Sequence, residues 1–200
     1  ISYAFNSCTS LESIQFPDSV GYLDCYFSDC PSLLSIKFPT ALSVSGQYSN
    51  FSGCTSLKSV ILPKCSKLYS VGQAMFKNCT ALESVDFQNS VNKIRPEAFM
   101  NCSSLTTFSG DAEIQEISSQ AFSGCSSLTA VPGNNKLRVI SQLAFENCTS
   151  LKSVPSLDNL EKIGVRAFGG CSNLLSVGEL NSLKAIMYDA FKNCTVLSSI

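Results

Sequence analysis

Hydrophobic residues recur along the chain with a nearly constant period. Nine cysteines lie 22 to 25 residues apart, and the last five spacings are all 23 residues. Each has a phenylalanine three residues before it, a leucine three residues after it and an apolar residue six residues after it. They are Cys8, Cys30, Cys54, Cys79, Cys102, Cys125, Cys148, Cys171 and Cys194. A fixed period of this length predicts a solenoid, in which each coil packs mainly against its neighbours.

The residues that follow each leucine predict a short β-strand. Residues 84–87 alternate between polar (Ser, Asp) and apolar (Val, Phe) side chains, which indicates a strand with one buried face. Stacked strands would form a parallel sheet with about 4.8 Å between coils, so nine coils would extend over about 40 Å. A second apolar pair, such as Val91 and Ile94, predicts a second strand on the opposite side. The Ala-Phe-x-x-Cys motif predicts one tight helical or 3₁₀ turn.

We therefore expect residues 1–200 to form one repeat solenoid of about nine repeats. It would consist mostly of short parallel strands and curve into a right-handed superhelix. Residues 19–27 and 41–50 fit the repeat poorly. Neither end has the polar capping segment that usually terminates a solenoid, which favours a segment of a longer array.

Composition and charge argue against two classes of partner. Only 14% of the residues are charged, and the formal net charge is −1. The Lys and Arg residues are scattered, so the phosphate-neutralising patch of a nucleic-acid-binding protein is missing. No apolar stretch reaches the roughly 20 residues that a membrane-spanning helix needs.

The side chains needed for catalysis are also missing. The chain has no histidine, which excludes Ser-His-Asp and Cys-His arrangements. Acidic pairs such as Glu113 and Glu116 are typical of solvated loops, and no Gly-rich phosphate loop is present. We expect no enzymatic activity and no cofactor.

We interpret the nine repeat cysteines as buried free thiols. Neighbouring Cα atoms would be about 4.8 Å apart, but parallel side chains do not suit disulfide geometry. A zinc site would need a Cys-x-x-Cys pair or histidine, and the chain has neither. Cys25 and Cys65 lie outside the period. Whether they are oxidised stays open, and a local disulfide between Cys25 and Cys30 is an alternative.

One row of small residues suggests a contact surface. Five residues after each repeat cysteine stand Ser13, Ser35, Ser59, Ser84, Thr107, Ala130, Ser153, Ser176 and Ser199. Four larger side chains flank this row and are candidate partner-binding residues: Gln15, Lys37, Ile61 and Asp86. Either the small residues only permit close stacking, or they form a flat face that contacts a protein or a glycan.

Tyrosines gather in the irregular first third of the chain. Four of the six lie between residues 22 and 69: Tyr22, Tyr26, Tyr48 and Tyr69. Aromatic side chains are favoured anchors in interfaces, so these four are further candidate partner-binding residues. The alternative is that they fill gaps left by poorly fitting repeats.

Five asparagines begin the Asn-x-Ser/Thr pattern of N-glycosylation. They are Asn50, Asn78, Asn101, Asn147 and Asn193. In a eukaryotic secretory host these sites could be modified. The four that immediately precede a repeat cysteine are better explained as turn residues of the repeat, which satisfy backbone groups.

The repeat resembles a known family. The chain has Leu-x-x-Ile/Val-x-Phe, then Leu-x-x-Ile, then Ala-Phe-x-x-Cys, and residues 82–102 contain a full copy. This pattern is similar to the BspA-like class of leucine-rich repeats, over the whole chain. The resemblance implies a protein at the cell surface or secreted, involved in adhesion to host proteins or to other cells. It implies no catalytic residues.

The resulting hypothesis is a non-enzymatic recognition or adhesion module. Its partner would be a host extracellular-matrix or surface protein, or a glycan. The alternative is a structural scaffold or filament component, intracellular or wall-associated, in which the stacked array is built into a larger assembly.

Overall fold

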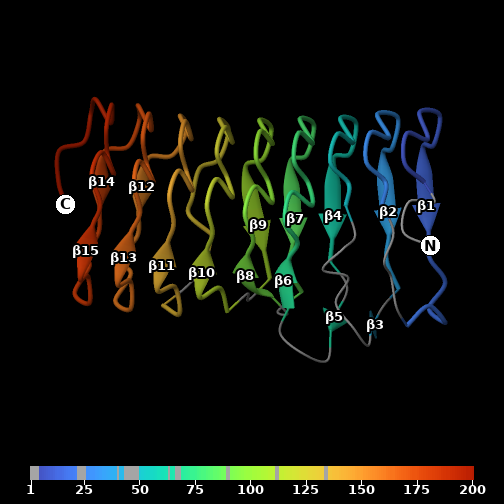
Figure 1. Cartoon of the computed structure of the whole chain (residues 1–200), viewed down its shortest axis with the longest axis horizontal. Coiled ribbons are helices and arrows are strands. Elements are labelled where there is room, and N and C mark those ends of the chain that lie inside the picture. The colour runs from blue at the N-terminus through green and yellow to red at the C-terminus, as the bar shows by residue number, and fades with distance from the viewer. Residues whose placement is uncertain are drawn as a thin grey trace.

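The chain forms an elongated stack of similar coils. The computed structural model describes residues 5–21, 26–39, 41–42, 50–62, 64–65, 69–88, 91–110, 113–132 and 135–200, with only the backbone at 41–42, 64–65 and 69. The coils follow one another along the long axis, and the strands lie in two rows (Figure 1). All named strand pairs are parallel, which confirms the predicted leucine-rich-repeat solenoid of short parallel strands.

The first strand row contains the strands that follow the repeat leucines. They are β1 (Ser13–Gln15), β2 (Ser35–Lys37), β4 (Ser59–Ile61), β7 (Ser84–Asp86), β9 (Thr107–Ser109), β12 (Ser153–Val154) and β14 (Ser176–Val177). Hydrogen bonds join them in three groups, β1-β2, β4-β7-β9 and β12-β14. In this row, the described residues around Val131 form no strand. Pro132, which follows Val131, lacks the N–H group that a ladder bond would need.

The second strand row confirms the strand predicted from the second apolar pair. A short pair, β3 (Ala41–Leu42) and β5 (Lys64–Cys65), precedes a six-stranded sheet. That sheet contains β6 (Tyr69–Val71), β8 (Val91–Ile94), β10 (Glu116–Ile117), β11 (Val139–Ile140), β13 (Lys162–Ile163) and β15 (Ala185–Ile186). Equivalent residues pair, for example Ile117 with Ile94 and Ile140. A spacing of one period therefore sets the register between coils.

The core consists of columns of identical side chains. The repeat phenylalanines stack ring on ring, with centroids 4.7–5.7 Å apart and interplanar angles of 2–11°. From Phe27 to Phe168 these rings are buried. The repeat leucines and cysteines from the second to the eighth coil are fully buried beside them. Stacking supplies each coil with the core that it is too short to enclose alone.

The expected helical turn at Ala-Phe-x-x-Cys does not form in the described residues. The segment closes instead through single bonds to the third preceding residue, such as Cys102 N–H to the carbonyl of Phe99 at 3.1 Å. Two residues per regular coil have positive φ, for example Glu97 at 59° and Asn101 at 61°. A left-handed residue cannot continue a right-handed helix, so each turn is a series of tight bends. Their backbone groups bond to the next coil, as Phe99 N–H does to Ala121 at 2.8 Å.

Candidate recognition surface

The first strand row presents one face to the core and one to the outside. In β4 the middle residue, Val60, is buried, whereas Ser59 and Ile61 on either side are exposed. The same alternation is present in β1 and β2. The predicted hydroxyl row therefore lies on the outward face of the first strand row, which we call the outer face.

The structure places the four flanking candidates together on the outer face. Each ends a strand of the first strand row, and the four strands belong to consecutive coils: Gln15 in β1, Lys37 in β2, Ile61 in β4 and Asp86 in β7. The first three are exposed. Asp86 is half-buried because its carboxylate accepts 2.9 Å bonds from the backbone N–H and side-chain amide of Gln88.

A second flanking row was missed by the sequence interpretation. The residue four positions after each repeat cysteine lies beside the hydroxyl row and is exposed in most coils. This row contains Glu12, Leu34, Lys58, Glu83, Thr106, Thr129, Lys152, Leu175 and Ser198. Leu34 is 50% exposed and Leu175 is 52% exposed. The signal was available, since this position follows an invariant leucine yet varies from coil to coil.

The structure does not show whether the four tyrosines lie together in a binding site. Tyr22 and Tyr48 lie outside the described residues, and only the backbone of Tyr69 is described, at the start of β6. Tyr26 is half-buried and forms a β-bridge with Asn50 in the next coil. Their role in partner binding stays a prediction.

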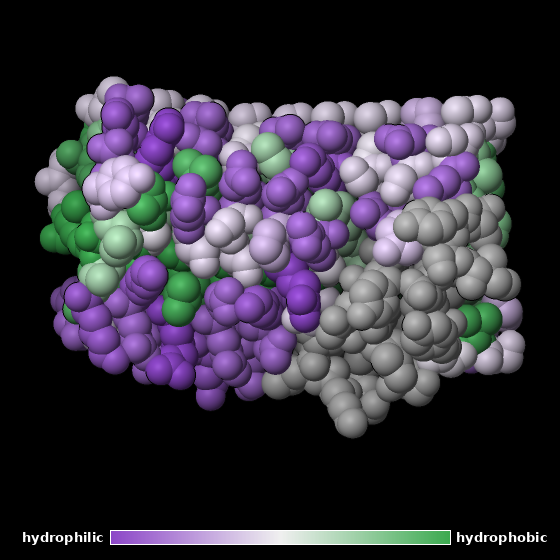
Figure 2. All heavy atoms as spheres, in the orientation of Figure 1, coloured by the Kyte–Doolittle hydropathy of each residue, from purple (hydrophilic) through white to green (hydrophobic). Residues whose placement is uncertain are grey.

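The outward face of the second strand row differs, because five of its charged side chains pair between coils: Lys93, Glu116, Arg138, Glu161 and Lys184. Lys93 lies 2.7 Å from Glu116. Glu161 bonds to Lys184 at 2.7 Å and also to Arg138, so it joins three consecutive coils. Lys184 and then Arg138 lower the pKa of the Glu161 carboxyl. Figure 2 shows a mainly hydrophilic region along the lower edge of the molecule toward its C-terminal half, while hydrophobic surface gathers at the C-terminal end.

The cysteine column has a structural role, and its thiols are expected to be unreactive. All nine repeat cysteines are free thiols, as the sequence predicted. From the second coil onward, each Sγ lies 3.0–3.2 Å from the carbonyl oxygen of the preceding coil's phenylalanine, to which the thiol donates. Burial raises the pKa of Cys125 to about 12. A thiol that stays protonated is a poor nucleophile and a poor metal ligand.

The off-period cysteines are not part of this column. Cys25 lies outside the described residues, and only the backbone of Cys65 is described. In the part of the chain that is described, no group of His, Cys, Asp and Glu side chains could hold a metal ion.

The asparagines of the glycosylation pattern lie at tight turns. The four before a repeat cysteine have φ of 60–62°, in the left-handed region that asparagine tolerates. The Nδ2 group of Asn101 donates to Oδ1 of Asn78 at 3.0 Å. Asn50 instead accepts the Ser52 N–H at 2.7 Å through its side chain. The position of these four asparagines at tight turns is confirmed. That their side chains satisfy backbone groups stays a prediction, as does glycosylation.

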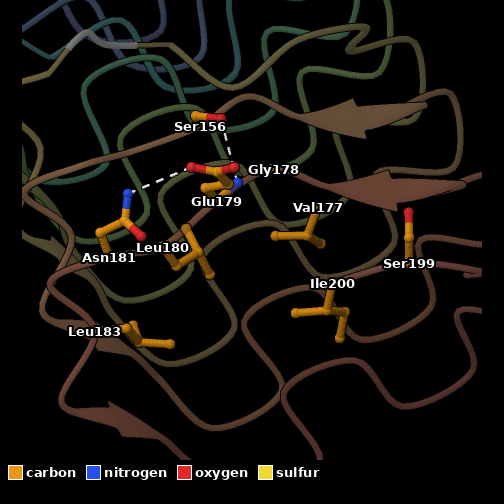
Figure 3. A pocket seen from close by; sticks show the side chains of 9 residues that line it. All are labelled: Ser156, Val177, Gly178, Glu179, Leu180, Asn181, Leu183, Ser199 and Ile200. Atoms are coloured by element: carbon orange, nitrogen blue, oxygen red, sulfur yellow. Dashed lines mark hydrogen bonds between the residues drawn. The ribbon is translucent and has the colours of Figure 1, made fainter.

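A pocket of 530 Å³ lies on the C-terminal coils. Figure 3 shows its lining residues, which are Ser156, Val177, Gly178, Glu179, Leu180, Asn181, Leu183, Ser199 and Ile200. Glu179 is its one carboxylate, and this group accepts a 3.5 Å bond from the Asn181 amide. Val177 and Ile200 belong to the column of core residues six positions past each cysteine. The pocket is therefore formed by core-column and turn residues of neighbouring coils, and its lining contains no acid–base pair.

Comparison with known proteins agrees with this architecture. A family model described as "BspA type Leucine rich repeat region (6 copies)" matches residues 1–106 and 92–200. No curated protein matches the chain. In the described ranges, no helix has the length and apolar character needed to cross a membrane.

Solved structures of bacterial repeat proteins are similar in fold. The T. pallidum leucine-rich repeat protein TpLRR has a TM-score of 0.64 and 24% identity, over 93% of this chain and 78% of its own. A leucine-rich repeat protein from Bacteroides ovatus has a TM-score of 0.57 and 25% identity, over 98% and 75%. The chain belongs to the BspA-type leucine-rich repeat family, whose members are generally protein-interaction modules and typically not enzymes.

Proposed function

We propose that this chain is a recognition module whose outer face binds another protein, in adhesion at a cell surface or after secretion. The observation that carries the proposal is the difference between the two strand rows. Most charges along the second row pair between coils and so favour stacking, although Lys162 in β13 has no ion pair with a described residue. On the outer face, Lys37 and Lys58 form no ion pair with a described residue, and aliphatic side chains are exposed beside them.

These features suit contact with a protein. A specific protein interface combines exposed apolar anchors with polar groups that the partner can satisfy. The outer-face rows contain small hydroxyls, charges and aliphatic residues, and no aromatic side chain stands at these positions on which a sugar ring could stack. A protein partner is therefore favoured over a glycan. The family resemblance supports a host extracellular-matrix or surface protein as the class to test first.

The test is solid-phase binding of the chain to a panel of extracellular-matrix proteins and to a glycan array. A variant with Ser59→Arg and Thr107→Arg places bulky charges on the outer face. The matched control, Asn92→Arg with Gln115→Arg, places them on the second strand row. We expect saturable binding to a matrix protein that the outer-face variant loses and the control keeps.

Two results would overturn the proposal. One is that the chain binds no protein in the panel, or binds glycans alone. The other is that the control variant loses binding while the outer-face variant keeps it. Equal thermal unfolding of the two variants is required, because Ser59, Thr107 and Gln115 are exposed and Asn92 is half-buried.

A further inference from the structure

The first strand row is interrupted around the sixth coil, where the described residues form no strand, and also between the second and third coils, which both have one. Leu34 N–H bonds to the Glu12 carbonyl at 2.8 Å, and Glu83 N–H bonds to that of Lys58 at 2.8 Å. The equivalent bond from Lys58 N–H to Leu34 does not form, and no hydrogen bond between described residues joins β2 to β4. We call this interruption the seam.

The coils on either side of the seam remain stacked at their turns. Phe27 N–H bonds to Asn50 and Asp29 N–H bonds to Ser52, both at 2.7 Å. The rings of Phe27 and Phe51 lie 5.1 Å apart. The gap between the second and third coils therefore affects only strands β2 and β4. Backbone groups on the facing edges of these two strands have no hydrogen-bond partner among the described residues. Such groups favour any ligand that can bond to them.

Four exposed side chains surround the seam. Leu34 precedes β2 and Lys37 ends it, while Lys58 precedes β4 and Ile61 ends it. Equivalent positions lie side by side where the strands pair, as in β1-β2 and β4-β7. The same stacking across the seam places Leu34 opposite Lys58 and Lys37 opposite Ile61. The two lysines lie on one diagonal and the two aliphatic residues on the other. We call these four residues the seam quartet.

The seam quartet combines exposed apolar side chains with lysines that have no ion-pair partner among the described residues. Leu34 is 50% exposed and Ile61 is 62% exposed. Neither lysine forms an ion pair with any residue that the structure describes. Exposed aliphatic residues ordinarily occur singly, but here Leu34 and Ile61 lie beside two lysines that have no ion-pair partner among the described residues.

Acidic residues on the neighbouring coils limit the size and charge of a ligand that could bind to the seam quartet. Glu12 lies beside Leu34 on the first coil, and Glu83 and Asp86 lie beside Lys58 and Ile61 on the fourth. The positive region is thus about two coils wide, or on the order of 10 Å, between acidic borders. A long acidic surface would be repelled at both borders, whereas a short acidic segment would be attracted to the centre.

We infer that the seam quartet binds a short acidic peptide segment of a partner protein, with aliphatic side chains beside its carboxylates. The lysines would pair with the carboxylates, and Leu34 and Ile61 would contact the aliphatic groups. This inference rests on the proposed function and specifies where on the outer face it is performed and by what chemistry.

The experiment is selection of a random peptide library displayed on phage against the whole chain, followed by affinity measurement on synthetic copies of the enriched peptides. Two variants alter the seam quartet: Lys37→Glu with Lys58→Glu, and Leu34→Ser with Ile61→Ser. The matched controls, Lys152→Glu and Leu175→Ser, change the same row on the seventh and eighth coils. All six residues are exposed, so thermal unfolding should be nearly equal in all variants.

We expect enriched peptides that are acidic and contain aliphatic residues. Each quartet variant should weaken their binding by about tenfold or more, the controls by less than about twofold, and added salt should weaken wild-type binding. Neutral or basic enriched peptides, equal losses in the controls, or no enrichment would overturn the inference. The panel experiment above decides the proposed function separately, because its first criterion is whether the wild-type chain binds any protein of the panel, whatever the chemistry of the contact.

Discussion

Alkaline pH should destabilise this fold through its column of buried thiols. Burial is the main cause that raises the pKa of Cys54, Cys125 and Cys171 from 9.0 to about 12. Burial also strongly raises the pKa of Cys79, Cys102 and Cys148. The bonds to phenylalanine carbonyls act in the same direction, because a thiol donates a hydrogen bond only while it is protonated. The backbone of the preceding coil's cysteine lowers the pKa, but this effect is smaller than that of burial.

The sign follows from which state loses protons first. In the unfolded chain a thiol ionises near pH 9, whereas the same thiol in the fold stays protonated to about pH 12. The stability that each thiol contributes is therefore fully present below about pH 9 and is lost as the pH rises above it. At pH 10 the loss is about 1.4 kcal/mol per thiol. Six such thiols lose about 8 kcal/mol together, comparable to the whole stability of a typical domain.

The assay is urea unfolding at pH 8, 9 and 10, followed by circular dichroism with a reductant present. Tyrosine and lysine also titrate in this range, so the comparison must be between variants. Cys102→Ala removes one thiol, and Cys102→Ala with Cys148→Ala removes two. We expect the alkaline loss to shrink in steps of about 1.4 kcal/mol per thiol removed.

The reasoning would be refuted if the double variant lost as much free energy between pH 8 and pH 10 as the wild type. It would also be refuted if the native wild-type thiols reacted with a disulfide reagent at pH 8 as fast as those of the unfolded chain.

Three further predictions concern packing, each measured by urea unfolding. Phe122→Ala should cost about 4–5 kcal/mol, because the ring is fully buried between two stacked rings, whereas Phe191→Ala on the half-buried last coil should cost less; equal costs would contradict the column model. Gly124→Ala should destabilise by more than about 1 kcal/mol, since φ is 76° and the new Cβ would lie 2.5 Å from Oδ1 of Asn101; a neutral result would show that the turn can rearrange. Val131→Asp should uncouple the two halves of the stack by burying an unpaired charge, giving two unfolding transitions; one unchanged transition would count against it.

The turn shows where sequence reasoning was incomplete. The Ala-Phe-x-x-Cys motif has the apolar spacing of a helical turn, but Glu97 and Asn101 adopt left-handed conformations. Asparagine or glycine before most of the cysteines was a usable signal for one of these bends. The other position has no such signal, because Ala74 and Leu143 occupy it with φ of 52° and 58°. There the bonds to the next coil impose the conformation.

The outer face was also only partly predictable. The period placed Gln15, Lys37, Ile61 and Asp86 in one row correctly, because equivalent residues of successive coils must neighbour each other. The period could not show that Lys93 and Glu161 find partners while Lys37 and Lys58 have none among the described residues. Pairing depends on which side chains the adjacent coils present and on their lateral offset.

By itself, the sequence determined that this chain stacks. A period of about 23 residues with inward-facing Phe, Leu, Val and Cys side chains leaves burial between coils as the way to form a core. Only the tertiary structure decided where the strand rows are continuous, which turns are left-handed and where the seam opens. Those features depend on the distance and lateral offset between whole coils. Core packing, turn conformation and strand hydrogen bonds all contribute to this distance and offset, so the sequence of a single repeat does not specify them.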